Sequence, residues 1–263
     1  MIKGNSALSL LQRVVPHLII VAGVLLSLDF LVRVGWISRW TFPTLDDLLR
    51  ALYTFGSNPE VPHGFISNYL TTLYTVMIAF MIVIGVGLPS SFALVLNKGA
   101  RDVFYPLILA FFAIPAVILY PAIVLLFGIG IESKIALGVL VGLPPLIITT
   151  TGALSYLNWG YLRMARVFTN SVSKIFVKVA IPSIFPILTT ALQLGLSYTF
   201  VGVIVGEMVA SGIGMGFLVS WGNTTFRTPI MYAATVVVIL TALAINLTFS
   251  WLDRRVRGRM RTL

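Results

Sequence analysis

The chain has 263 residues, of which 58% are hydrophobic and 10% are charged, and its mean hydropathy is +1.01. This composition excludes an ordinary water-soluble domain and indicates an integral membrane protein. The sequence contains no cysteine, which excludes disulfides, thiolate nucleophiles and cysteine-type metal sites. The net charge is +10, but the basic residues flank apolar runs. We therefore expect contact with membrane lipid and none with nucleic acid.

Six apolar runs are long enough to cross a bilayer as helices, which takes about 20 residues. The first run begins after Lys3 and Arg13 as a signal sequence would, but no small-residue cleavage site follows it, so we expect it to be retained. We predict an all-α membrane protein with about six transmembrane helices. The runs cover residues 14–36, 69–96, 104–127, 135–154, 184–208 and 229–252.

Basic residues concentrate in alternate connecting segments. If both termini are cytoplasmic, the inner segments hold most of the lysines and arginines, including the C-terminal stretch RRVRGRMR at 254–261. Most acidic residues then lie outside or near the outer face. This distribution satisfies the positive-inside rule. We predict a multi-pass protein of the cell membrane with both termini in the cytoplasm.

Residues 163–182, RMARVFTNSVSKIFVKVAIP, form a long basic segment between the fourth and fifth runs, on the predicted cytoplasmic side. Apolar residues recur there at three- and four-residue steps, with Arg166, Lys174 and Lys178 between them, which is the pattern of an amphipathic helix. The pattern alone leaves two interpretations open. The helix lies on anionic lipid, or it docks into a groove of a soluble partner.

The spacing in this segment resembles the cytoplasmic loop of importer permeases of the ATP-binding-cassette (ABC) superfamily, which reads E-A-A, three residues, G, nine residues, I-x-L-P. Three further segments resemble the sulfonate, taurine and nitrate branch of these permeases, in matching order: FPTLDDLLRAL (42–52), IPAVILYPAIVLLFGIGIESKI (114–135) and VGVIVGEMVASGIGMGFLV (201–219). The coupling-loop positions identified by the resemblance are Arg163, Met164, Ala165, Thr169, Ser171, Ile175, Val179, Ile181 and Pro182.

This resemblance implies a type I ABC importer permease, with a five-helix core and a cytoplasmic coupling helix that binds a separate ATPase. The chain would bind no cofactor and would not be an enzyme, because ATP and Mg²⁺ would be held by the ATPase. A second permease copy or a related permease would complete the translocation path. A solute-binding protein would dock on the outer loops, including residues 39–65. The implied cargo is a small solute, either a sulfonate- or nitrate-like anion or a vitamin precursor.

The expected division of the chain follows from the runs and the resemblance together. An N-terminal tail and first helix (1–40) precede a periplasmic loop (41–68), and the permease core (69–255) precedes a basic cytoplasmic tail (256–263).

The coupling loop departs from the family pattern at two places. Family members usually carry Glu where Arg163 stands and Gly where Thr169 stands. Arg163 places a cation at a helix N-terminus, where it is disfavoured, and Thr169 is β-branched. Either the ATPase has diverged to match, or the chain pairs with a second permease that keeps the usual loop. We favour the second explanation.

Several residues within the runs are candidates for a path or a gate. Glu207 lies near the outer end of the fifth run, and an acid at membrane depth is costly unless it is paired. Solvation at the outer mouth and pairing with Arg227 are the structural alternatives. Gly202 and Gly206 form a G-x-x-x-G pair that permits close helix packing. The other candidates are Gln193, Tyr198, Pro115 and Pro121, with a polar cluster at Asn68, Tyr69, Thr71, Thr72 and Tyr74.

Two glycine-rich stretches, FGIG (127–130) and GIGMG (212–216), lack the strand context of a nucleotide-binding fingerprint. We predict that both are re-entrant turns, the second of them flexible. Pro144 and Pro145 are interpreted as a helix end. His17 and His63 have no partners at metal-binding spacing, so no metal site is predicted.

A stand-alone secondary transporter or channel is the alternative function. It would need ion-relay residues deep in the spans, and the runs contain none apart from Asp29, Arg33 and Glu207 near the outer face. Asp29 and Arg33 are four residues apart and are predicted to pair with each other. A membrane-embedded enzyme would need a catalytic pair, and the sequence offers none.

Overall fold

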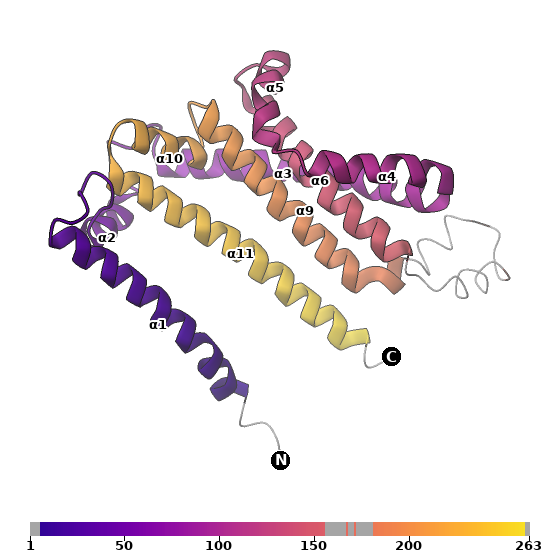
Figure 1. The fold of residues 1–263 in the computed structure, drawn as a ribbon, viewed down its shortest axis with the longest axis horizontal. Helices are drawn as coiled ribbons and strands as arrows, with labels where there is room; N and C mark the ends of the chain where they lie inside the picture. The colour runs from indigo at the N-terminus through magenta and orange to yellow at the C-terminus, as the bar shows by residue number, and fades with distance from the viewer. Residues whose placement is uncertain (1–5, 156–166, 168–170, 172–180, 261–263) are drawn as a thin grey trace. The chain divides into compact units, whose positions relative to one another are not determined.

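The computed structural model describes residues 6–155, 167, 171 and 181–260. Within these ranges the chain forms helices and no strand, which confirms the all-α prediction. Figure 1 shows the elements along the chain. They are α1 (Ser6–Arg33), α2 (Leu45–Thr54), α3 (Phe65–Leu96), α4 (Lys98–Phe112), η1 (Ala116–Leu119), α5 (Tyr120–Phe127), α6 (Ile131–Ser155), α9 (Ile181–Val209), α10 (Met215–Thr224) and α11 (Thr228–Met260).

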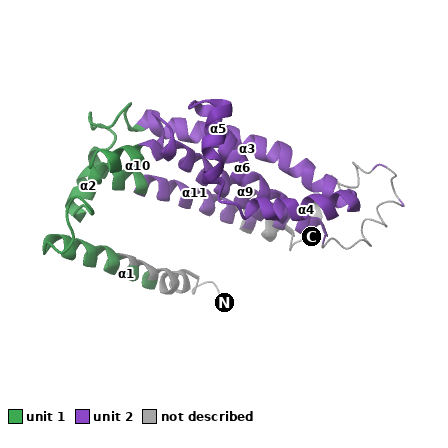
Figure 2. Ribbon diagram, turned by 45° about the horizontal axis from the view of Figure 1, so that its top comes forward, with its two compact units in different colours: residues 1–65, 218–235 green, residues 66–217, 236–263 purple. Residues whose placement is uncertain are grey.

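The chain divides into two compact units, coloured separately in Figure 2. Unit 1 comprises residues 1–65 and 218–235, and unit 2 comprises residues 66–217 and 236–263. Unit 1 therefore holds α1 and α2, and unit 2 holds the packed helices α4, α5, α6 and α9.

Unit 1 is held together locally by Asp29, near the end of α1. Its carboxylate accepts hydrogen bonds from Arg33 Nε at 2.7 Å and from the Leu45 backbone N–H at 2.8 Å. Arg33 also donates to Asp46 at 2.7 Å. The predicted pairing of Asp29 with Arg33 is confirmed, and the same carboxylate fixes the start of α2. The Thr44 hydroxyl caps that helix by accepting from the Asp47 N–H.

Each predicted apolar run coincides with helix, but the third is not continuous. Among the described residues, four helices are long and apolar enough to span a membrane: Phe65–Leu96, Ile131–Ser155, Ile187–Val209 and Thr228–Trp251. The predicted run 104–127 is broken into α4 and the η1–α5 segment, which are bent by 90°. Pro115 lies at this break and is the N-cap of η1, as expected where a missing backbone N–H interrupts a helix.

Pro144 and Pro145 lie inside α6, so the interpretation of these residues as a helix end is wrong. Both are buried. The surrounding helices compensate for an interrupted backbone ladder in a bundle of this kind.

The core of unit 2 is built by α3, α6 and α9. Phe80 and Val83 of α3 pack with Leu146 of α6 and Ala191 of α9 in one buried cluster. Close approach of α6 and α9 depends on glycine. A Cβ added at Gly202 would lie 3.0 Å from both Gly138 Cα and the Leu137 carbonyl oxygen. The expectation that Gly202 serves close helix packing agrees with this contact.

Candidate functional site

Glu207 lies in α9 and is only 2% exposed. Its burial is inconsistent with the alternative in which it is solvated. Arg227, the other proposed partner, is bonded to Glu60 within unit 1. A buried carboxylate at membrane depth requires compensating hydrogen bonds, and Glu207 has several.

The carboxylate of Glu207 joins three parts of unit 2. The Thr72 hydroxyl of α3 lies 2.8 Å from both carboxylate oxygens and donates to them. The Gly216 N–H, in the first turn of α10, donates at 2.9 Å. Thr72 Oγ1 in turn accepts from the Met215 N–H at 2.8 Å, and Asn68 Oδ1 accepts from the Gly214 N–H at 2.8 Å. An anion at the N-terminus of a helix is stabilised by the helix dipole.

The end of the GIGMG stretch is therefore bonded to α3 and α9 at Gly214, Met215 and Gly216. Its flexibility stays a prediction. Gly214 has a φ of +122°, and a Cβ there would lie 2.6 Å from Glu207 Oε2. A Cβ at Gly216 would lie 2.8 Å from Glu207 Cβ and closer still to the Ile204 carbonyl oxygen. Both glycines permit the backbone to reach the carboxylate.

Lys134 is a second buried charge, which lies one residue before the predicted apolar run 135–154 and is not singled out by it. It lies in α6 and is 4% exposed. Its ammonium donates to the Gly130 carbonyl at 2.8 Å and to the Ile129 carbonyl. These carbonyls follow the end of α5, where a cation is favoured. The signal available in the sequence was a lysine four residues after the last glycine of FGIG.

Replacing Thr72 with valine is expected to destabilise unit 2 by about 1–3 kcal/mol, since the Met215 N–H would be left buried without its acceptor. Chemical unfolding of the purified protein in mixed micelles would measure this. Thr72→Ser keeps the hydroxyl and serves as the matched control. Equal stability of the valine variant and the wild type would contradict the assignment.

The other candidate path residues occupy separate places. Gln193 donates to Asn246 of α11 at 2.7 Å. The Tyr198 ring packs against Phe112, with 5.4 Å between ring centroids. Gly206 faces Lys134, whose Cγ would lie 3.3 Å from an added Cβ. Pro121 opens α5. Gln193 and Tyr198 are thus engaged in helix contacts, and the structure does not bring them together with Glu207 in one cavity.

The predicted coupling loop falls mostly outside the described residues. Arg163, Met164, Ala165, Thr169, Ile175 and Val179 lie outside them. Ser171 is described and half-buried, and Ile181 and Pro182 are the first residues of α9.

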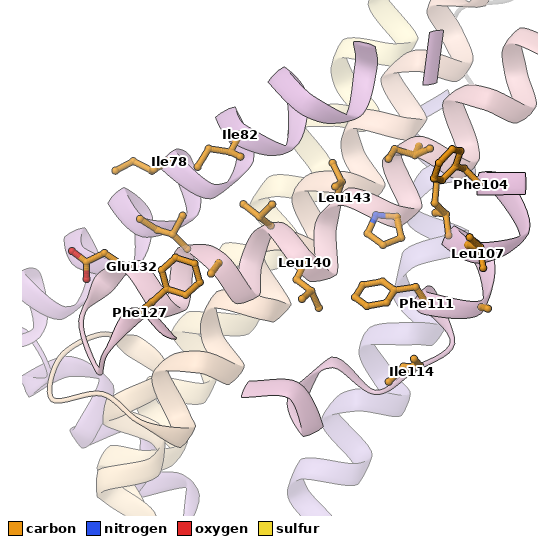
Figure 3. Close-up of a pocket in the computed structure, with 17 residues that line it drawn as sticks. Ile78, Ile82, Phe104, Leu107, Phe111, Ile114, Phe127, Glu132, Leu140 and Leu143 are labelled. Carbon is orange, nitrogen blue, oxygen red and sulfur yellow. The ribbon is translucent and has the colours of Figure 1, made fainter. Parts of the chain in front are cut away.

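A large groove in unit 2 is apolar (Figure 3). Its volume is about 1100 Å³, and it is lined by α3, α4, α5 and α6. Figure 3 shows Glu132 at one end of the groove and Ile114 and Phe104 toward the other. Glu132 is the ionisable residue among its lining side chains. Such a lining disfavours a strongly polar solute.

The helical bundle and its buried, hydrogen-bonded charges define a multi-pass membrane protein. Residues 84–262 match the family model described as "Binding-protein-dependent transport system inner membrane component". The chain belongs to this family, and it is a permease subunit of a binding-protein-dependent ABC importer.

Individual relatives agree with this assignment. A probable ABC transporter permease protein of Haemophilus influenzae is 25% identical over 92% of this chain and 97% of its own length. The taurine transport system permease protein TauC of Escherichia coli is 26% identical, over 87% of this chain and 86% of its own length. These relatives confirm the resemblance seen in the sequence.

The fold also has a solved counterpart. A chain of the MetNI methionine ABC transporter, in an inward-facing conformation, matches with a TM-score of 0.64 and 20% sequence identity. The match covers 71% of this chain and 93% of that chain. This likeness shows the fold, which is that of a type I ABC importer permease.

Proposed function

We propose that this permease subunit serves an ATP-driven importer for a small solute, either a sulfonate- or nitrate-like anion or a vitamin precursor. The observation that carries the proposal is the family match over residues 84–262. The taurine permease among the relatives supports the sulfonate class. The chain itself hydrolyses nothing and holds no cofactor, and a separate ATPase binds ATP and Mg²⁺.

The solute path runs between two permease subunits in this proposal. Within one chain, the large groove of the described part is apolar, and the cavity beside Glu207 has a volume of only about 140 Å³. These features support a path completed by a second permease copy or a related permease. Specificity then comes mainly from a solute-binding protein on the outer side, and both termini lie in the cytoplasm.

The test uses the absence of native cysteine. A single cysteine at Ser171 is expected to cross-link to the co-expressed ATPase in an ATP-dependent manner. A matched cysteine at Gly56, an open position in unit 1, is expected to give no such product. Absence of a cross-link at Ser171, with labelling that places this segment against lipid, would favour transport without an ATPase.

Substrate class is tested separately. Cells that carry the complete importer are expected to accumulate radiolabelled taurine or nitrate faster than cells that lack this chain. If both solutes accumulate equally fast with and without this chain, taurine and nitrate are excluded and the search turns to vitamin precursors.

A further inference from the structure

Two buried charges of opposite sign line one small cavity in unit 2. The cavity has a volume of about 140 Å³, and Lys134 and Glu207 are the charged residues among its lining side chains. No salt bridge within 4.0 Å joins these two described residues. The remaining lining residues are Thr71, Thr75, Ile129, Gly130, Ile131, Ser211, Gly212 and Ile213.

Lys134 bonds directly to one loop, and Glu207 bonds to the helix that follows another loop. Lys134 donates to Ile129 and Gly130 in loop 128–130, which joins α5 to α6. Glu207 accepts from the Gly216 N–H in the first turn of α10. Loop 210–214 joins α9 to this helix. Both loops contribute residues to the cavity wall. Lys134 of α6 and Glu207 of α9 thus line the same cavity, next to the two glycine-rich turns.

Electrostatics favours treating the charges as one unit. A buried ion without a counter-charge is destabilised by several kcal/mol, and Lys134 and Glu207 are 4% and 2% exposed. Glu132 is close to Lys134 in sequence, but it is exposed and lines the apolar groove. Residues two apart on a helix do not face each other. Glu207 is therefore the counter-charge on the cavity side.

We propose that Lys134 and Glu207 act as one charge pair across this cavity and hold loops 128–130 and 210–214 together. Lys134 is then a positioning residue for loop 210–214, although its hydrogen bonds go to the other loop. A gating role for this pair in import rests on the proposed function. The structural coupling between the two loops is independent of the proposed function.

The test places a reporter cysteine in loop 210–214 of the full-length protein in nanodiscs. Gly212 is exposed, and a Cβ added there meets nothing within 4 Å. Gly99, at the start of α4, is also exposed and provides a matched control reporter. Lys134→Met is expected to raise the maleimide labelling rate at Gly212→Cys by roughly tenfold, within the range for coupled neighbouring groups. The rate at Gly99→Cys stays unchanged.

Three comparisons distinguish a charge pair across the cavity from an effect of Lys134 on loop 128–130 alone. Lys134→Arg keeps the charge and is expected to keep the labelling rate that Gly212→Cys shows with Lys134 in place. Lys134→Met combined with Glu207→Gln removes both charges, and its labelling rate is expected to fall below that of Lys134→Met alone. A reporter at Ile129→Cys that speeds up while Gly212→Cys does not would overturn the proposal, and so would an equal rise at both glycine reporters.

Recovery of folded protein and uptake by the assembled importer are measured separately. If Lys134→Met gives no folded protein, recovery of folded protein in the double variant supports the pair, and failure to recover overturns it. In the assembled importer, slower uptake by Lys134→Met with an intact Ser171 cross-link supports the gating role. Unchanged uptake overturns that role. If Ser171→Cys gives no cross-link in the chain that keeps Lys134 and Glu207, the proposed function is refuted. The labelling result would still support the charge pair.

Discussion

Replacing Glu207 with alanine is expected to lower the free energy of unfolding of unit 2 by about 3–5 kcal/mol, the cost of removing one partner from a buried charged network. The change leaves the Thr72 hydroxyl and the Gly216 N–H without their acceptor. It also leaves Lys134 as an uncompensated charge beside the same cavity. Chemical unfolding in mixed micelles would measure the loss.

Glu132→Ala is the matched control, because this glutamate lies in α6, the helix that carries Lys134, but is exposed. Its contribution is that of a carboxylate in the first turn of α6, worth about 0.3–1 kcal/mol. Similar losses for the two alanine variants would show that burial and hydrogen bonding do not distinguish Glu207.

Local patterns in the sequence predicted much of this fold. Hydropathy located the helices because a bilayer sets their length, and four-residue spacing identified the Asp29–Arg33 pair. Glu207 stood out as an acid within an apolar run. Its partner Thr72, 135 residues away, also stood out, but only as one of several polar residues at the start of a run. The spacing of residues along one helix does not show which distant helix those residues will contact.

Lys134 was missed for a related reason. The predicted apolar run begins at residue 135, but α6 begins at Ile131, so Lys134 lies one turn inside the helix. Helix ends are the least certain part of a sequence-based prediction. The break at Pro115 is also not predicted by hydropathy, because the run 104–127 is apolar throughout, yet its two helical parts are bent by 90°. Hydropathy reports burial in lipid and does not report backbone direction.

Packing between α6 and α9 leads to the second large effect. Gly142→Ala is expected to destabilise unit 2 by about 1–3 kcal/mol through overpacking. A Cβ at Gly142 would lie 2.9 Å from the Gly195 carbonyl oxygen and closer still to Thr199 Oγ1. Unfolding in mixed micelles again provides the measurement.

Gly152→Ala is a matched control on the same helix, since an added Cβ there meets nothing within 4 Å. It is expected to be neutral or to stabilise by up to about 1 kcal/mol through helix propensity. Equal changes in unfolding free energy for the two alanine variants would mean that helix propensity, and not contact with α9, determines the effect of replacing these glycines.

A second-site change separates the two clashes at Gly142. Thr199→Ala removes the hydroxyl that an added Cβ would meet first, and it should recover part of the lost stability. Recovery is expected to be incomplete, because the Gly195 carbonyl belongs to the backbone of α9 and cannot rotate away. Full recovery would show that α9 moves outward to accept the methyl group, and that close backbone contact here is dispensable.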